Sequence, residues 1–311
     1  MTLIQLSAPL TVTDGGLETT LVFHHGIDLP DFAAFPLLDT EHGRGALADY
    51  YQPYLDLGRR LGTPVVVDTP TWRANLDWGA RLGYDTTRLA AVNRRAVEFV
   101  RDLATNRPGG PVEHVVDGVV GPRGDGYVVG EAMSASEAAA YHGLQARAFA
   151  EAGAAMMTAV TMTYVDEAIG VVRAAGSVSL PVVISFTVET DGVLPSGEPL
   201  GDAIARVDGA TDAAAAYYMV NCAHPAHFAE QLTLGAGWLA RVKGIRANAS
   251  RCSHAELDEA TELDRGDVVD LAGWYGRLNA LLPDLRVVGG CCGTDHEHVA
   301  AIAESLTGVR A

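Results

Sequence analysis

The stretch VVGGCCG, residues 287–293, joins a short apolar run to two adjacent cysteines flanked by glycines. Similar apolar runs, rich in valine, precede it along the chain, and alanine-rich stretches separate them. Near-continuous apolar runs are typical of parallel strands, which are buried on both faces of the sheet. The sequence therefore predicts eight strands, at residues 11–14, 64–69, 114–120, 155–161, 181–188, 216–222, 240–247 and 285–289.

The segments between these runs are long enough for crossover helices, and many show helical spacing of apolar residues. Alternating strands and helices indicate an α/β fold, and eight strands favour a closed (β/α)8 TIM-type barrel over an open doubly wound sheet. Residues 14–16, Asp-Gly-Gly, follow the first strand but do not form the G-x-G-x-x-G loop of a dinucleotide site. We expect one barrel domain over residues 1–311. The predicted helical stretches are residues 41–61, 86–106, 136–152, 163–175, 223–234, 254–282 and 297–306.

The composition limits the classes of partner. The chain has 311 residues, 48% of them hydrophobic, and a formal net charge of -17. This charge argues against nucleic acids and anionic membranes, which require basic patches. No apolar run approaches the roughly 20 residues of a membrane span, and the first residues lack the basic start of a secretory signal. We therefore expect a cytoplasmic protein whose partners are small molecules.

The cysteines lie where a barrel would place an active site. Four cysteines in a chain of this length, without a signal peptide, do not suggest a disulfide framework. Cys222 ends the sixth predicted strand, and Cys291 and Cys292 follow the eighth. The carboxyl ends of the strands meet at one face of a barrel, where active sites of this fold occur. The three cysteines can therefore converge, and the flanking glycines allow the backbone to turn there.

Three thiolates suit Zn²⁺, because catalytic zinc typically has three protein ligands and one open position. Such a centre would bind and activate another thiol, whose free pKa is about 8.5. Two other interpretations stay open: the cysteines are buried apolar fillers, or Cys291 and Cys292 form a redox-active dithiol without metal. Cys252 is expected to be inert. Asp14 and the amide groups beside it either bind an amino-acid head group or form a tight turn.

Five segments together indicate a family. They are DGGLETT at residues 14–20, GIDLP at 26–30, GPRGD at 121–125, NCAHP at 221–225 and GGCCGT at 289–294. With these segments the chain resembles the homocysteine S-methyltransferase family over nearly its whole length. The GGCCGT run paired with the upstream Asn-Cys is the specific part of the resemblance, and the other segments support it.

The resemblance implies a (β/α)8 barrel in which zinc binds the sulfur of homocysteine. It implies methyl transfer from a small onium donor, of the S-methylmethionine or S-adenosylmethionine type, to homocysteine, which forms methionine. Asp14 would help to hold the amino group of the acceptor. The zinc ligands and catalytic residues are expected to be Cys222, Cys291 and Cys292, and the expected substrate contacts are Asp14, Gly15, Gly16, Thr161, Glu189 and Asn221.

The chain departs from the family pattern in two places. Many members carry Glu-Thr at the end of the fourth strand, where this chain has Val160-Thr161. The second strand continues as TPTWRAN at residues 69–75, which introduces Arg73. Glu189 could replace the missing carboxylate, although ordinary loop solvation explains it as well. Two alternatives therefore stay open: a different small thiol, whose carboxylate meets Arg73, and a zinc-carrying binding protein without turnover.

Overall fold

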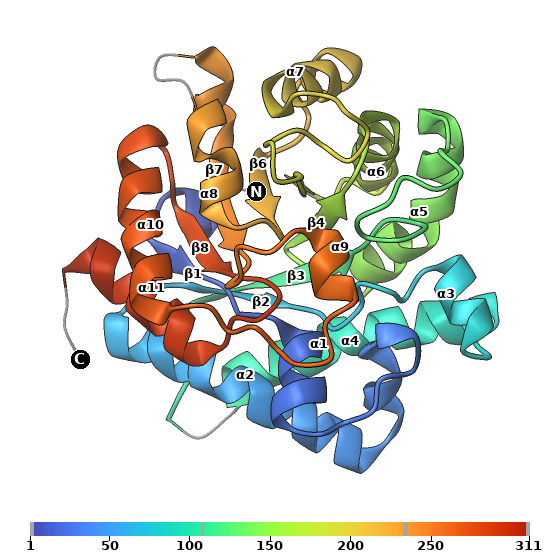
Figure 1. The fold of residues 1–311 in the computed structure, drawn as a ribbon. Helices are drawn as coiled ribbons and strands as arrows, with labels where there is room; N and C mark the ends of the chain where they lie inside the picture. The colour runs from blue at the N-terminus through green and yellow to red at the C-terminus, as the bar shows by residue number, and fades with distance from the viewer. Residues whose placement is uncertain (1–2, 107–108, 233–235, 309–311) are drawn as a thin grey trace.

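The computed structural model describes residues 3–106, 109–232 and 236–308, and its strands form one closed barrel (Figure 1). All pairs are parallel, each strand pairs with the next along the chain, and β8 closes the barrel on β1 through Val12 and Val288. The predicted (β/α)8 barrel is thus confirmed, and every predicted strand overlaps an observed one. The strands are β1 (Thr11–Val12), β2 (Val65–Asp68), β3 (His114–Val120), β4 (Met156–Met162), β5 (Val182–Phe186), β6 (Tyr217–Asn221), β7 (Val242–Ala247) and β8 (Val287–Gly290).

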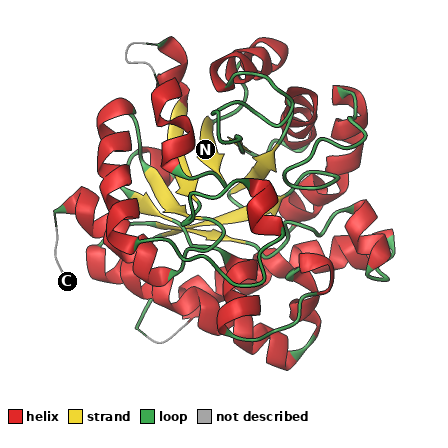
Figure 2. Ribbon diagram, viewed as in Figure 1, coloured by secondary structure: helices red, strands yellow, loops and turns green. Residues whose placement is uncertain are grey.

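Helices surround the strands (Figure 2). The long ones lie in the crossover connections and bury one face against the sheet. None of the helices in the described ranges combines enough length and apolar character to cross a membrane. The α-helices are α1 (Leu17–Thr19), α2 (Glu41–Leu61), α3 (Leu76–Arg81), α4 (Thr86–Asn106), α5 (Ala135–Glu151), α6 (Val165–Ser177), α7 (Leu200–Thr211), α8 (Pro225–Phe228), α9 (His254–Asp258), α10 (Val268–Leu281) and α11 (His296–Thr307).

Three helix predictions need correction. The predicted helix at 254–282 is two helices, because Gly266 has a φ of 55° and Asp267 caps a new helix, α10. Of the predicted stretch 223–234, only α8 is α-helical, and its last two residues lie outside the described part of the chain. The helix α7 was not predicted; its segment mixes apolar residues with glycine and aspartate, which are poor helix formers.

The barrel interior changes from apolar to charged along its axis. Val66 and Asp68 lie on the same face of β2, and Val115 and Asp117 on the same face of β3, because side chains alternate along a strand. Near the amino ends of the strands the interior is filled by an apolar cluster that includes Leu3, Val66 and Val115. The layer above this apolar cluster is polar. It contains Asp68 and Asp117 and lies directly under the mouth of the barrel, where the strands end.

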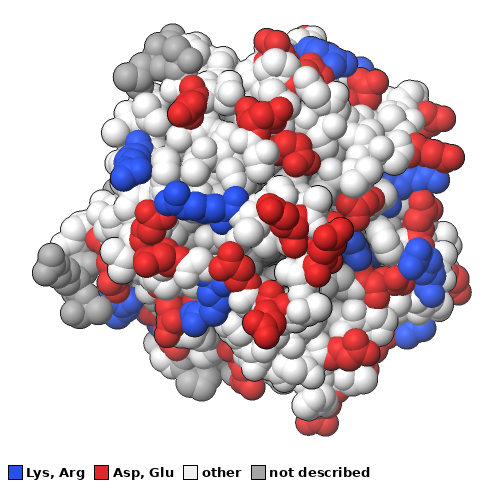
Figure 3. Space-filling view, in the orientation of Figure 1, with Lys and Arg blue, Asp and Glu red and all other residues white. Residues whose placement is uncertain are grey.

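The outer surface is rich in acidic residues. On the face seen in Figure 3, acidic side chains are spread widely and basic ones lie singly or in small groups between them. This distribution agrees with the formal net charge of -17.

The glycines before the cysteine pair are required by close packing. A Cβ atom on Gly289 would overlap Thr13 Oγ1 and come 2.7 Å from the carbonyl oxygen of Asp14. We predict that Gly289→Ala lowers the free energy of unfolding by about 1–3 kcal/mol, as overpacking typically does. Thermal unfolding measures this change. The matched control is Gly273→Ala, at an open helical position, which should not lower the melting temperature. A Gly289→Ala protein as stable as wild type would contradict this packing argument.

Candidate metal centre and substrate cavity

The structure brings three cysteine sulfurs together at the carboxyl ends of β6 and β8. The sulfur atoms of Cys222, Cys291 and Cys292 all lie within 4.8 Å of one another, and those of Cys222 and Cys292 are 3.9 Å apart. Among the described residues this is the one group of three or more His, Cys, Asp or Glu side chains that could hold a metal ion. Cys252 lies outside the group and is exposed.

Cys222 is held in an unusual backbone conformation. Its φ is 54°, a left-handed value that is uncommon for residues other than glycine. Its N–H donates to the carbonyl of Arg246 at 3.1 Å. Its own carbonyl accepts hydrogen bonds from Asn248 Nδ2 at 3.1 Å and His254 Nε2 at 2.6 Å. Backbone strain of this kind persists only where surrounding contacts maintain it, and it is frequent at functional sites.

A tight turn presents the other two sulfurs. The Cys291 N–H donates to the carbonyl of Ala247 at 2.9 Å, which attaches the turn to the end of β7. Thr294 Oγ1 donates to the carbonyl of Cys291 at 2.7 Å. Gly293 has a φ of 79°, so a side chain there would be strained. The glycines that the sequence analysis singled out thus permit two consecutive cysteines to face one centre.

Polar groups contact the sulfurs from outside. Asn221 Nδ2 lies 3.8 Å from Cys291 Sγ, and the Tyr127 hydroxyl lies 3.6 Å from Cys292 Sγ. The Tyr127 ring stacks on His254 with ring centroids 4.0 Å apart, which fixes its position. Burial raises the pKa of Cys292 to about 11, so without a nearby cation this cysteine is a neutral thiol at pH 7. A bound metal ion would change that protonation state.

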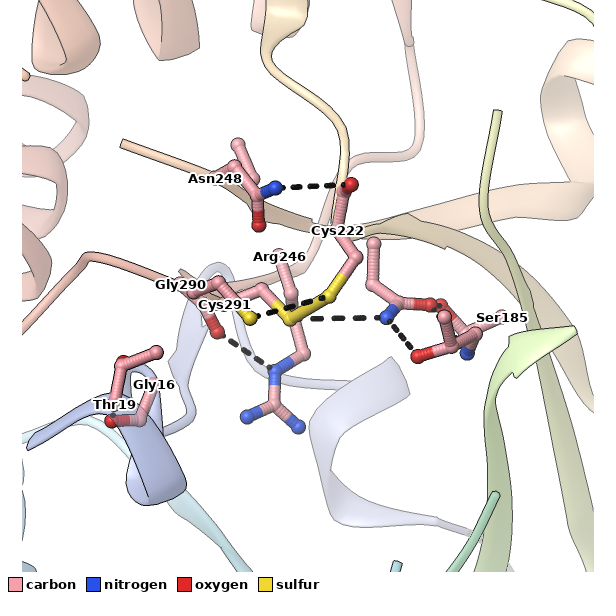
Figure 4. Close-up of a disulfide and its surroundings, with 12 residues drawn as sticks. Gly16, Thr19, Ser185, Cys222, Arg246, Asn248, Gly290 and Cys291 are labelled. Carbon is pink, nitrogen blue, oxygen red and sulfur yellow. Dashed lines mark hydrogen bonds between the residues drawn. A yellow bond between two sulfur atoms is a disulfide. The ribbon is translucent and has the colours of Figure 1, made fainter. Parts of the chain in front are cut away.

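Cys222 and Cys291 are joined by a disulfide in this structure (Figure 4). This bond was not predicted from the sequence, because a separation of 69 residues gives no sign that two sulfurs will bond. Both sulfurs must be reduced to thiolates before they can bind a metal. In that form the three soft donors fit a zinc ion with one open coordination position.

A cavity of about 430 Å³ opens above the sulfurs. Its apolar wall is aromatic in large part and includes Trp72, Tyr127 and Phe32. Of the residues expected to contact substrate, Asp14, Gly15, Gly16, Thr161 and Asn221 line this cavity, together with the three cysteines.

Glu189 is placed differently from the other expected contacts. It is not among the cavity-lining residues, and its carboxylate lies 3.3 Å from His254 Nδ1. Val160 does line the cavity and contributes neither charge nor a side-chain hydrogen bond. The structure therefore offers no carboxylate at the end of β4, and Glu189 faces the neighbouring loop.

Asp14 is paired with an internal cation. Arg246, on β7, pairs with Asp14 Oδ1 through one terminal nitrogen and with Asp68 Oδ2 through the other. The Tyr50 hydroxyl donates to Asp14 Oδ2 at 3.0 Å. The Arg246 Nε donates to the carbonyl of Gly290, directly before the cysteine pair (Figure 4). Arg246 was not predicted as a site residue, although an arginine near the carboxyl end of a predicted strand was a usable signal.

The comparisons agree with this geometry. The family model described as homocysteine S-methyltransferase matches residues 11–306. The chain belongs to the homocysteine S-methyltransferase family of enzymes. The match covers the barrel, both cysteine segments and the Asp14 turn, so the resemblance noted from the sequence is confirmed.

Solved structures of one protein share the fold. The homocysteine methyltransferase MmuM from Escherichia coli matches in its oxidised form with a TM-score of 0.74 and 21% identity, over 95% of this chain and 96% of that one. Its metallated form matches with a TM-score of 0.72 and 20% identity, over 95% and 96% of the two chains. At this identity the likeness shows the fold alone. A search of proteins with curated functions gives no match.

The geometry predicts the metal stoichiometry. The reduced protein should bind about one zinc ion per chain, since three thiolates form one site. Cys222→Ser, Cys291→Ser and Cys292→Ser should each remove most of the bound zinc, measured by elemental analysis after dialysis. The control is Cys252→Ser, which should retain full zinc content because Cys252 is exposed and is not part of the group. Full zinc content in both Cys291→Ser and Cys292→Ser proteins would contradict the assignment.

The pKa of Cys292 predicts the pH dependence of zinc binding. Protons compete with the metal for each thiolate, so affinity falls on acidification. Because burial raises the pKa of Cys292 to about 11, this competition extends through neutral pH. Zinc affinity should therefore keep rising between about pH 6 and pH 9. Competition with a chromogenic chelator measures this trend, and a flat profile over that range would show that the thiols do not bind the metal.

Proposed function

We propose that this chain catalyses zinc-dependent methyl transfer from a small onium donor to a small thiol, with homocysteine as acceptor and methionine as product. The observation that carries the proposal is the trio of cysteine sulfurs, all within 4.8 Å of one another, beside a cavity at the barrel mouth. Cys222, Cys291 and Cys292 would hold the zinc ion. Membership in the family supports the choice of homocysteine.

The side chains around the trio have distinct tasks. When bound, zinc would lower the pKa of the acceptor thiol and stabilise its thiolate. Asn221 Nδ2 and the Tyr127 hydroxyl contact the sulfurs at 3.8 and 3.6 Å and so orient them. The cavity walls bring acceptor and donor together and exclude water. The acceptor sulfur then attacks the donor methyl carbon, the new S–C bond forms, and the old bond breaks with its electron pair leaving on the donor.

The charge of the cavity supports a cationic donor. Its lining includes two arginines, Arg73 and Arg246, against seven carboxylates. A wall with excess negative charge attracts cations, and aromatic faces such as Trp72 and Tyr127 stabilise onium groups. A sulfonium of the S-methylmethionine or S-adenosylmethionine type meets both conditions. The seven acidic residues are Asp14, Glu18, Asp68, Asp125, Asp258, Glu262 and Asp264.

A reducing, cytoplasmic location would suit this site, because oxidation of two cysteines removes two metal ligands. The partners in this proposal are the small-molecule acceptor and donor.

The direct test is an assay of the reduced, zinc-loaded protein with homocysteine and each sulfonium in turn. Methionine formation, measured by mass spectrometry, should exceed the rate without protein. Cys292→Ser should lose essentially all of this activity. If wild-type protein binds zinc and homocysteine but forms no methylated thiol with any onium donor, the chain is a binding protein and the proposed reaction is wrong.

A further inference from the structure

Asp14 is poorly placed to serve as the main anchor for a charged ligand group. One of its oxygens pairs with Arg246 and the other accepts a hydrogen bond from Tyr50. Its side chain is only 6% exposed. A ligand ammonium that approached Asp14 would meet a carboxylate already neutralised by a buried guanidinium.

Asp68 is occupied in the same way. Its Oδ2 pairs with Arg246, and its side chain is only 7% exposed. On its other side lies Asp117, whose pKa is raised well above the usual value by burial and by the charge of Asp68. Burial and the charge of Asp68 thus favour the neutral form of Asp117.

The acids nearer the mouth are engaged locally or lie in solvent. Asp125 accepts hydrogen bonds from the backbone N–H groups of Tyr127 and Val128. Asp264 accepts from Ser250 Oγ and the Gly266 N–H. The remaining two, at positions 258 and 262, are exposed to solvent, which weakens any ion pair they form.

Glu18 differs from all of these. It lies on α1, lines the cavity and is half-buried. Its side chain has no direct hydrogen bond or ion pair with another described residue, although the charges of Arg73 and Arg246 lie near enough to favour its ionised form. The segment that carries it packs directly on the cysteine turn. The Gly293 N–H donates to Thr19 Oγ1 at 3.3 Å, and a Cβ on Gly16 would come 2.7 Å from the Cys291 carbonyl oxygen. Glu18 is thus an unpaired carboxylate held beside the metal centre.

We infer that Glu18, rather than Asp14, is the carboxylate that binds the ammonium group of an amino-thiol acceptor. This inference rests on the proposed function and names the residue that selects the acceptor. Burying a carboxylate without a partner costs free energy, and a ligand ammonium offsets that cost by donating a charge-assisted hydrogen bond. Burial also raises the pKa of Glu18 to about 7, so its ionised form gains from a bound cation. Glu18 thereby supplies the charge that Val160 lacks.

The experiment compares homocysteine with its des-amino analogue, sulfanylbutanoate, in wild type and Glu18→Gln. Glutamine keeps the size and removes the charge. For homocysteine, kcat/KM should fall about 10- to 100-fold, the factor expected for one charge-assisted hydrogen bond. For sulfanylbutanoate it should change less than about twofold, because that acceptor has no ammonium group to lose. The matched control is Glu259→Gln, at an exposed position outside the cavity lining, which should leave both acceptors unchanged.

A binding measurement separates this inference from the proposed function. Calorimetric titration of the zinc-loaded protein with each thiol, without donor, requires no turnover. A selective loss of homocysteine binding in Glu18→Gln supports the inference even if no donor gives turnover, in which case only the proposed reaction fails. An equal effect on both thiols, or none on homocysteine, overturns the inference even if methyl transfer is observed.

Discussion

The ion pairs of Arg246 hold the mouth of the barrel together. Its guanidinium pairs with Asp14 and Asp68, at the ends of β1 and β2, which follow β7 and β8 around the closed barrel. Its Nε binds the carbonyl of Gly290, and its own carbonyl accepts the N–H of Cys222. One residue therefore contacts both cysteine segments. Removing one partner of a buried ion pair typically costs about 3–5 kcal/mol, a large fraction of the roughly 5–15 kcal/mol by which a domain is stable, so these positions are tightly constrained.

This constraint changes the chemistry of the cavity. An arginine beneath the metal centre neutralises the acids that would otherwise face the ligand, so the number of carboxylates in the lining overstates the charge that a ligand meets. A carboxylate can bind a cationic ligand group most favourably when no residue of the protein already pairs with it. Glu18 meets that condition because it makes no direct hydrogen bond or ion pair with another described residue, although Arg73 and Arg246 favour its ionised form. Substrate selection in this cavity thus depends on which carboxylates the fold has already neutralised.

Sequence patterns were sufficient for the barrel and for the convergence of the cysteines. Short valine-rich runs favour buried strands, and eight of them with crossovers place every carboxyl end at one mouth. The pairing of Arg246 with Asp14 spans 232 residues in sequence. It depends on the closure of the sheet, which brings β1 within two strands of β7, and on which side chains then meet inside the barrel; a one-dimensional pattern does not contain that information. Glu189 shows the same limit. It directly follows the fifth predicted strand, which suggested a position in the site, but its carboxylate lies beside His254 instead.

The disulfide follows from the same proximity that makes a metal site. Three sulfurs close enough to share one cation are also close enough for two of them to bond after losing two electrons. The two states exclude each other, because a disulfide has no thiolate charge to offer a metal. A bound zinc ion would therefore protect Cys222 and Cys291 from oxidation and, in the proposed reaction, prepare the site for an external thiol. Three cysteines from two strand ends, with no bulkier ligand between them, would leave a metal one open coordination position. The same closeness of the sulfurs makes the site sensitive to oxidation.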